Sequence, residues 1–196
     1  MIIVHLTWMG PEDQSPPVRF GVNELADAIR GRGMEVVETM ADDGNAAGTA
    51  SVTIGLLLTS SAPKTGASPR FYAEDYVIIP CAEGPMLVGH GPAGMMYACL
   101  DLAEQLAMGA DLRQVTPRSA TPELAVRGLY TFLHNAEAER DWLYDPAFWQ
   151  DYADTLARYR FNRFNLIYGH QTAHLIPIYA HLLDDLDDDF PGIRVE

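Results

Sequence analysis

The stretch AVRGLYTFLHNAEAERDWLYDPAFWQDYADTLARYRFNRFNLIY, residues 125–168, decides the fold that this sequence predicts. Apolar runs open and close it, at residues 126–133 and 161–168, and both have the composition of strands. A polar connection, residues 134–141, follows the first run, and a helix occupies most of the remaining distance. Strand, helix and strand at this spacing predict a βαβ unit with parallel strands and a right-handed crossover.

The helix of this unit has clear signals at both ends. We expect Asp145 as its N-cap and Pro146 at its first position. Large side chains recur at three-to-four-residue spacing and predict one buried face: Phe148, Tyr152, Thr155 or Leu156, and Tyr159. Arginines gather at the other end, where positive charge suits the helix dipole: Arg158, Arg160 and Arg163.

Three features of this stretch resemble the opening of a glycoside hydrolase barrel. They are the pair Arg127-Gly128 on an apolar strand, a helix that ends in residues 157–162, and a strand that begins Phe164-Asn165-Leu166. The similar families are the β-N-acetylhexosaminidases and, less closely, the α-glucuronidases. The resemblance implies the first βα units of a (β/α)8 barrel, whose active site lies at the carboxyl ends of the strands.

The resemblance also implies a role for Arg127, because the arginine of the hexosaminidase Arg-Gly pair contacts sugar hydroxyls. The structural alternative is that Arg127 locks the strand by bridging to a carboxylate. Its place near the start of the strand favours that alternative, whereas the resemblance favours ligand binding. The sequence departs from the hexosaminidase pattern further on, with Phe132 where that family has Asp, and Leu133-His134-Asn135 where it has Ser-Arg-His.

The residues before this stretch predict a separate α+β domain, residues 1–110. Strands are expected at residues 2–8, 34–40, 51–60, 76–80 and 86–89, the last two joined as a hairpin. Helices are expected from Arg19 to the glycines at 31 and 33, and from Pro92 to Met108. We expect a mixed sheet with both helices on one face. The segment from Gly91 to Leu106 resembles the small accessory domain that precedes the barrel in the same glycosidases.

A dinucleotide site competes for residues 89–94, which fit the pattern G-x-G-x-x-G after a strand and at the start of a helix. That motif belongs to the first strand of a parallel βαβ unit, but Gly84-Pro85 places the preceding strand in a hairpin. Asp111 precedes any strand that could follow the helix. We therefore interpret the glycines as a tight strand-to-helix turn and expect no cofactor.

Residues 111–124, which contain Pro117 and Pro122, are predicted to be a surface linker. The final segment, residues 125–196, then has 196 − 124 = 72 residues, against about 250 for a complete barrel. The sequence thus predicts the beginning of a barrel and no more. We expect exposed apolar surface on its strands, at Tyr130, Phe132, Phe164 and Leu166, for packing against missing sequence or another chain.

Candidate substrate-binding residues follow from the rule that barrel sites lie after the strands. The first strand leads to His134 and Asn135, and the second to Gly169, His170 and Gln171. Together with Arg127, we select His134, Asn135 and His170. Glu137 and Glu139 are interpreted as part of a solvated turn. No pair of carboxylates for glycosidase chemistry is recognised, and no histidine pair has zinc-site spacing, so no metal is expected.

Composition excludes several other functions. Apolar residues make up 48% of the chain, enough for a packed core, and the formal charge of −14 opposes binding to nucleic acid or anionic membranes. Cys81 and Cys99, both in apolar settings, are expected to be buried free thiols. The start of the chain has no basic segment or cleavage pattern. We expect a cytoplasmic protein, or a secreted parent whose leader was removed.

The leading hypothesis is the N-terminal part of a carbohydrate-active hydrolase that acts on glycosidic bonds, without its catalytic acids and inactive alone. The alternative is a self-contained, non-catalytic carbohydrate-binding or interaction module, in which the βαβ segment closes into a small sheet.

Overall fold

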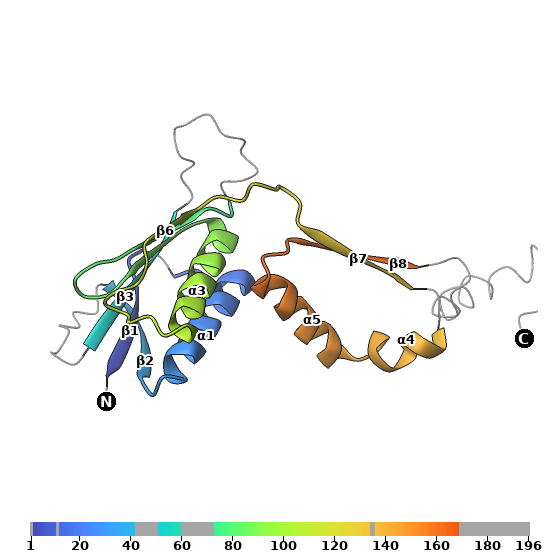
Figure 1. Cartoon of the computed structure of the whole chain (residues 1–196), viewed down its shortest axis with the longest axis horizontal. Coiled ribbons are helices and arrows are strands. Elements are labelled where there is room, and N and C mark those ends of the chain that lie inside the picture. Colours follow the sequence, from blue (N-terminus) through green and yellow to red (C-terminus); the bar gives the residue numbers. More distant parts are fainter. Residues whose placement is uncertain (1, 11, 42–50, 60–72, 134–135, 169–196) are drawn as a thin grey trace, which may run out of the picture. The chain divides into compact units, whose positions relative to one another are not determined.

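The structure is a computed structural model that describes residues 2–10, 12–41, 51–59, 73–133 and 136–168. It divides into two compact units, residues 1–125 and 126–196. Each unit has its own sheet (Figure 1).

The first unit is built on a six-stranded mixed sheet. Its strands are β1 (Ile3–Trp8), β2 (Glu35–Met40), β3 (Ser51–Thr59), β4 (Tyr76–Ile79), β5 (Met86–His90) and β6 (Arg118–Ala120). They are arranged in the order β2-β1-β3-β5-β4-β6. The four strands β2, β1, β3 and β5 are parallel to one another, and β4 is antiparallel to both β5 and β6. The predicted mixed sheet and the β4–β5 hairpin are confirmed.

Two helices, α1 (Pro16–Arg30) and α3 (Gly91–Ala107), pack side by side on one face of this sheet, as the sequence predicted (Figure 1). Their apolar faces meet the inward side chains of β1 and β3 in one core: Val4, Leu6, Trp8, Val22, Leu25, Ile29, Ile54, Leu56, Met95, Cys99, Leu102 and Leu106. Burying one such side chain contributes about 1.5–3 kcal/mol. The alternation of buried and half-buried residues along β1 reflects the period of two of a strand with one face on the core.

Two boundaries in this unit differ from the prediction. Helix α1 begins at Pro16, before the expected Arg19, because proline is favoured in the first turn, where its missing N–H has no helical partner. Strand β6 lies within the predicted linker. Its three residues carry no strand pattern of their own, and they form a strand because β4 offers a free edge.

The two thiols have different environments, so the prediction that both are buried is wrong for Cys81. Cys99 is fully buried within α3, and burial raises the pKa of its thiol to about 12. Cys81 is exposed in the turn after β4, with its sulfur 3.6 Å from the Ile79 carbonyl oxygen. The sequence around Cys81 is apolar because β4 precedes it, but the strand ends at Ile79 and the chain leaves the sheet.

A thiol reagent should therefore separate the two cysteines. In the folded protein we expect rapid modification of Cys81 and protection of Cys99, since only the thiolate reacts and Cys99 is buried with a raised pKa. Mass spectrometry of the labelled peptides measures both sites. Equal labelling of the two thiols under native conditions would contradict the described core.

The second unit contains β7 (Gly128–Leu133), α4 (Ala136–Leu143), α5 (Pro146–Arg158) and β8 (Arg163–Tyr168). The strands β7 and β8 pair in parallel, as predicted. Asp145 is the N-cap of α5, and its Oδ1 accepts a hydrogen bond from the Ala147 N–H at 2.9 Å. The polar connection, in which we interpreted Glu137 and Glu139 as part of a solvated turn, mostly forms α4.

Candidate functional site

The carboxyl ends of β7 and β8 lie side by side, because the strands are parallel and Leu133 pairs with Tyr168. This is the edge at which a parallel barrel carries its site. The predicted substrate-binding residues that follow these ends, His134, Asn135 and His170, lie outside the described residues. Their role in binding stays a prediction.

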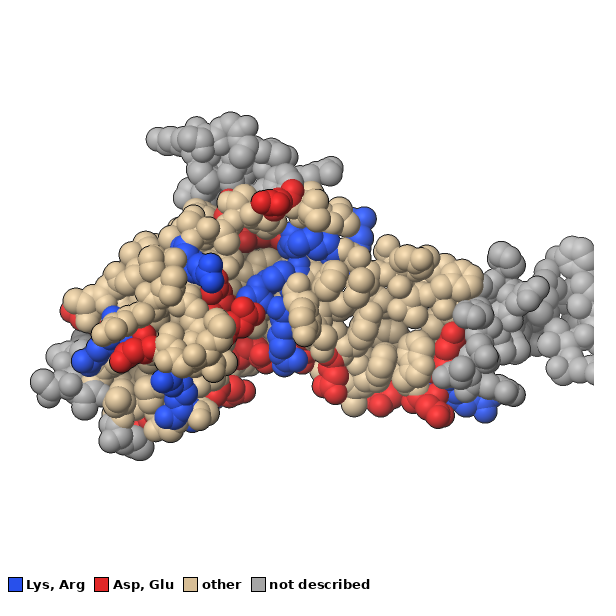
Figure 2. Space-filling view, in the orientation of Figure 1, with Lys and Arg blue, Asp and Glu red and all other residues tan. Residues whose placement is uncertain are grey.

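Apolar side chains on β7 are uncovered, as the sequence predicted for Tyr130 and Phe132, whereas the same prediction is wrong for Phe164 and Leu166 on β8. Tyr130 is 70% exposed and Phe132 is 49% exposed, while Phe164 and Leu166 are half-buried. In the space-filling view the surface over β7 and β8 is largely free of charged side chains (Figure 2). A parallel sheet is normally covered on both faces, so these strands expose the kind of surface that a partner element covers in other proteins.

Arg127 directly precedes β7, at the end of the strand opposite to the predicted site. Its backbone N–H donates to Asn162 Oδ1 at 2.9 Å, and its carbonyl accepts from the Asn162 N–H at 2.9 Å. The side-chain Nε–H donates to the Arg160 carbonyl at 2.7 Å. Arg160 adopts a left-handed conformation (φ 64°) just after α5. Arg127 therefore joins the start of β7 to the turn between α5 and β8.

These contacts show that Arg127 has a structural role, because its side chain bonds to the Arg160 carbonyl in the turn before β8. Arg127→Lys should lower the free energy of unfolding of the second unit by about 1 kcal/mol, because lysine has no Nε–H to reach Arg160. Urea unfolding measures the change. Arg163→Lys, an exposed position on β8, is the control, and equal stability of both variants would contradict this assignment.

An aromatic cluster packs α5 against β8 and gives this unit its core. The Trp149 ring lies 5.2 Å from Phe148, 6.0 Å from Tyr152 and 5.8 Å from Phe164, centroid to centroid. The Trp149 Nε1–H donates to the Leu143 carbonyl at 2.7 Å, which holds the end of α4. Phe148 and Tyr152 were predicted to share one buried face, but no residue of α5 is fully buried. Tyr159, expected on that face, is 74% exposed.

One carboxylate in this unit was misjudged from the sequence. Glu139, which we interpreted as part of a solvated turn, lies on α4 and is 7% exposed. The signal that could have found it is helical spacing, because Glu139 stands four residues before Leu143, and both are buried on α4. Fully buried carboxylates are uncommon unless they are paired. Glu139 is therefore a further residue of interest in this unit, beside those selected for the site.

In the first unit, the glycines of the G-x-G-x-x-G pattern contact the protein's own backbone. A Cβ at Gly89 would lie 2.3 Å from Met95 N, and one at Gly94 would lie 2.2 Å from Asp75 O. The Gly94 N–H, in the first turn of α3, already donates to the Ala73 carbonyl at 3.2 Å. The close approach of chain segments thus explains why Gly89 and Gly94 are glycines, in agreement with the interpretation of the motif as a tight turn.

A small polar group surrounds this turn. The His90 imidazole Nδ1 lies 2.8 Å from the Thr59 hydroxyl, which joins the ends of β5 and β3. His90 and the nearby Asp75 backbone are also linked, since the His90 N–H donates to the Asp75 carbonyl at 2.8 Å. Asp75 is 8% exposed. Desolvation raises the pKa of its carboxyl, while His90 and a hydrogen bond to Thr121 oppose the shift.

The raised pKa of Asp75 has a consequence for stability. Its folded pKa lies above the ordinary value of 3.8, so its contribution to stability is fully present below that pH and is lost as pH rises through the folded pKa. Asp75→Asn removes the buried charge and keeps an acceptor for Thr121. We expect the variant to gain stability relative to the wild type as pH rises from below 3.8, measured by urea unfolding at several pH values. A constant difference across that range would contradict it.

Within the described part of the chain, no group of three or more His, Cys, Asp or Glu side chains could hold a metal ion. Over the same residues, no helix is long and apolar enough to cross a membrane. The described residues thus offer polar groups for hydrogen bonding to a ligand, at the strand ends and the turns, and no assembled metal centre.

Comparison with known proteins gives matches of structure but not of sequence. Neither a protein-family model nor a curated protein matches the chain. It is similar to a solved GH138 enzyme that targets the pectin rhamnogalacturonan II, with a TM-score of 0.66 and 24% identity over 85% of this chain and 19% of that one. The fold is one found in glycoside hydrolases.

A second solved structure agrees with this result. It is a GH115 4-O-methyl-α-glucuronidase with specificity for decorated arabinogalactans, with a TM-score of 0.56 and 12% identity over 83% of this chain and 25% of that one. A GH20 β-N-acetylhexosaminidase from Streptomyces coelicolor A3(2) is a looser match, with a TM-score of 0.48 and 18% identity over 84% of this chain and 30% of that one. The predicted resemblance to glycoside hydrolases is confirmed, at the level of the fold. The chain spans a fifth to a quarter of the length of the GH138 and GH115 proteins.

Proposed function

We propose that this chain is the N-terminal part of a carbohydrate-active hydrolase that cleaves glycosidic bonds. In this proposal the first unit is an accessory domain, and the second unit is the opening βα segment of an incomplete (β/α)8 barrel. The observation that carries the proposal is the parallel pair β7–β8 with exposed Tyr130 and Phe132. An isolated two-stranded sheet is marginally stable, so we expect further strands that extend this sheet and close it into a barrel, whose other side chains would then pack against these residues.

The similar structures support the proposal by their fold and by how they align. Most of this chain aligns with a fifth to a quarter of two glycoside hydrolases, the GH138 enzyme and the α-glucuronidase. The substrate of the parent protein would be a glycoside of a uronic acid or of an amino sugar. His134, Asn135 and His170 would contact the sugar from the loops after β7 and β8. The resemblance to the hexosaminidases also implies a sugar contact for Arg127.

The decisive experiment compares this chain with the product of the gene extended beyond Glu196, on aryl glycosides of glucuronic acid and N-acetylglucosamine. Glycoside hydrolysis needs two carboxyl groups that flank the scissile bond, and we recognise no such pair in residues 1–196. We expect turnover by the extended product and none by the chain alone. Turnover by the 196-residue chain itself would overturn the proposal.

Arg127→Lys in the extended protein separates its two roles. Stability should fall in either case, because the bond to the Arg160 carbonyl is lost. If Arg127 also binds substrate, the KM of the folded fraction should rise, because lysine cannot offer two parallel donors to a carboxylate or to neighbouring hydroxyls. If Arg127 is only structural, the KM of the folded fraction is unchanged. Arg163→Lys again serves as the matched control.

The second candidate is a self-contained binding module, which the closed core of the first unit favours. A stop codon directly after Glu196 in the gene would support the module. Further strand–helix repeats with an acidic pair would support the hydrolase.

A further inference from the structure

The first unit contains a cavity of about 450 Å³ at the amino ends of its parallel strands. Its apolar wall is formed by Met34, Val52 and Leu112, and its polar side chains are Arg32, Asp111 and Arg113. The opening residues of β1, β2 and β3 are paired in register, so they meet at this one edge. The turn around His90, described above, is at the carboxyl ends of β3 and β5, so the cavity is a separate feature.

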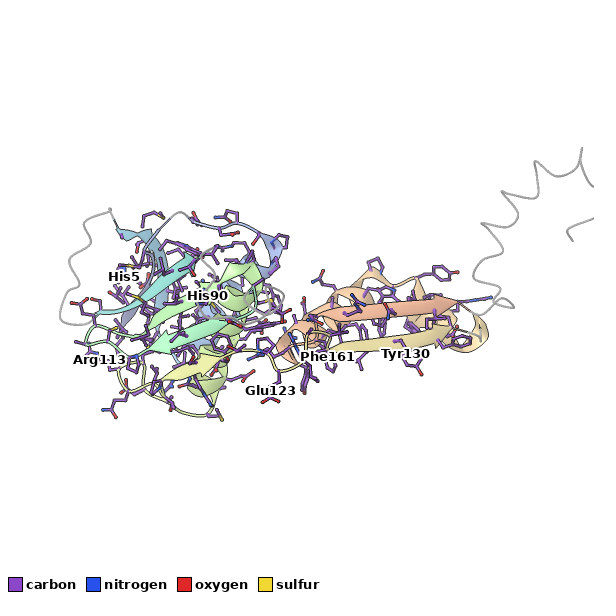
Figure 3. The ribbon with its side chains drawn as sticks, turned by 90° about the horizontal axis from the view of Figure 1, so that it is seen from above. His5, His90, Arg113, Glu123, Tyr130 and Phe161 are labelled. Carbon is purple, nitrogen blue, oxygen red and sulfur yellow. The ribbon has the colours of Figure 1, made fainter. Side chains whose placement is uncertain are left out.

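Each of the two arginines is anchored through one guanidinium nitrogen by hydrogen bonds to backbone carbonyls. Arg32 Nη1 donates to the carbonyls of Leu106 and Ala110 at the end of α3. Arg113, at the edge of the first unit (Figure 3), donates from Nη2 to the Ser51 carbonyl at 3.3 Å. Among the described residues, Nε and Nη2 of Arg32 and Nε and Nη1 of Arg113 have no protein partner. A guanidinium that is anchored by one nitrogen offers its remaining donors to a ligand at a reduced entropic cost.

The third polar side chain, Asp111, is an acidic acceptor of hydrogen bonds, whereas the arginines are donors. Asp111 Oδ1 accepts from the Arg113 backbone N–H at 2.8 Å, which fixes the carboxylate beside the arginine. Its other oxygen has no protein partner in the part of the chain that the structure describes. The cavity therefore combines two guanidinium groups, one carboxylate oxygen that can accept a hydrogen bond from a hydroxyl group, and an apolar wall.

We propose that this cavity binds a uronic acid unit, the carboxylate on the arginines and a ring hydroxyl on Asp111. A carboxylate matches the planar fork of a guanidinium, and sugar rings present C–H faces to apolar walls. The cavity volume lies in the range of small-molecule sites. The chain carries a formal charge of −14, so an anion is held only where cations are concentrated. That the unit belongs to the hydrolase's own polymeric substrate rests on the proposed function, whereas the binding chemistry does not.

The test is a titration of the 196-residue chain, followed by NMR, with glucuronate and with glucose, in which a hydroxymethyl group replaces the carboxylate. We expect glucuronate at millimolar concentrations, but not glucose, to shift the amide signals of Met34, Leu112 and Arg113. Binding should weaken as salt is raised, because the arginines are exposed. Absence of glucuronate binding, or equal binding of glucose, would overturn the proposal.

Variants assign the contacts. Arg113→Gln should weaken glucuronate binding about tenfold, since it removes one charge-assisted hydrogen bond at an exposed position. Asp111→Asn removes a negative charge beside the arginines, which favours both anions, and leaves a weaker acceptor for hydroxyls. The ratio of glucuronate affinity to acetate affinity should therefore fall, because acetate has no hydroxyl. Arg30→Gln, an exposed arginine paired with Asp27, is the matched control. Unchanged binding by folded Arg113→Gln would overturn the assignment.

The outcome is distinguishable from failure of the proposed function. Glucuronate binding without hydrolysis by the extended gene product leaves the cavity as an anion site in a protein of another activity. Hydrolysis without glucuronate binding leaves the hydrolase and removes the cavity proposal.

Discussion

Replacing Gly94 by alanine should destabilise the first unit by about 3 kcal/mol or more, measured as the free energy of unfolding in urea. A Cβ at this position would lie 2.2 Å from the Asp75 carbonyl oxygen, which is backbone and cannot rotate away. The same oxygen accepts the His90 N–H at 2.8 Å. Helix α3 would have to move from the turn that precedes β4, and its contacts with α1 and the sheet would be strained.

Gly10→Ala is the matched control, because its Cβ would have its nearest contact at 3.8 Å, with Leu57 Cδ1. We expect a change of less than about 0.5 kcal/mol there. If Gly94→Ala kept wild-type stability, the close approach of α3 to Asp75 would be wrong. The dinucleotide interpretation of the motif would then need to be reconsidered, because it predicts that Gly94→Ala lowers ligand affinity and not stability.

Trp149→Ala should have the other large effect, with a loss of about 2–3 kcal/mol in the second unit, below the value for a fully buried aromatic ring because Trp149 is half-buried. Trp149 contacts Trp142, Phe148, Tyr152 and Phe164, and its indole N–H holds the end of α4. Removal of the ring takes away the side chain that joins both helices to β8. Amide hydrogen exchange should show lost protection in α5 and β8, with α1 and α3 unchanged.

Tyr159→Ala provides the comparison at the end of the same helix. Its ring is 74% exposed, so we expect protection of α5 to stay near the wild-type level. An equal loss of protection in both variants would mean that the contacts of Trp149 hold α5 no more firmly than the exposed Tyr159 ring does, and would contradict the role of the aromatic cluster.

Several elements could be predicted because their signals are local. The alternation in β1 and the apolar spacing in α1 follow from the geometry of strands and helices. Asp145 and Pro146 predicted the start of α5 because a cap acts on backbone groups two or three residues away. Gly84-Pro85 predicted the β4–β5 hairpin for the same reason.

Other features depend on what lies across from a residue in space. Strand β6 forms because β4 has a free edge, and the residues Arg118-Ser119-Ala120 have no pattern that predicts a strand. Cys81 is exposed although its neighbours are apolar, and Glu139 is buried although its neighbours are polar. No sequence pattern predicted that β5 would pair in parallel with β3, because the paired residues are about thirty positions apart.

The sequence by itself thus determined the type of most elements, the parallel βαβ unit and the resemblance to glycoside hydrolases. Only the tertiary structure decided that Gly94 faces the Asp75 carbonyl, that Arg127 contacts Arg160 and Asn162, and that Arg32 and Arg113 share one cavity. The physical reason is that periodicity and capping act within one element. Burial, close approach and the sharing of a cavity depend on segments that are distant in the chain and meet only when it folds.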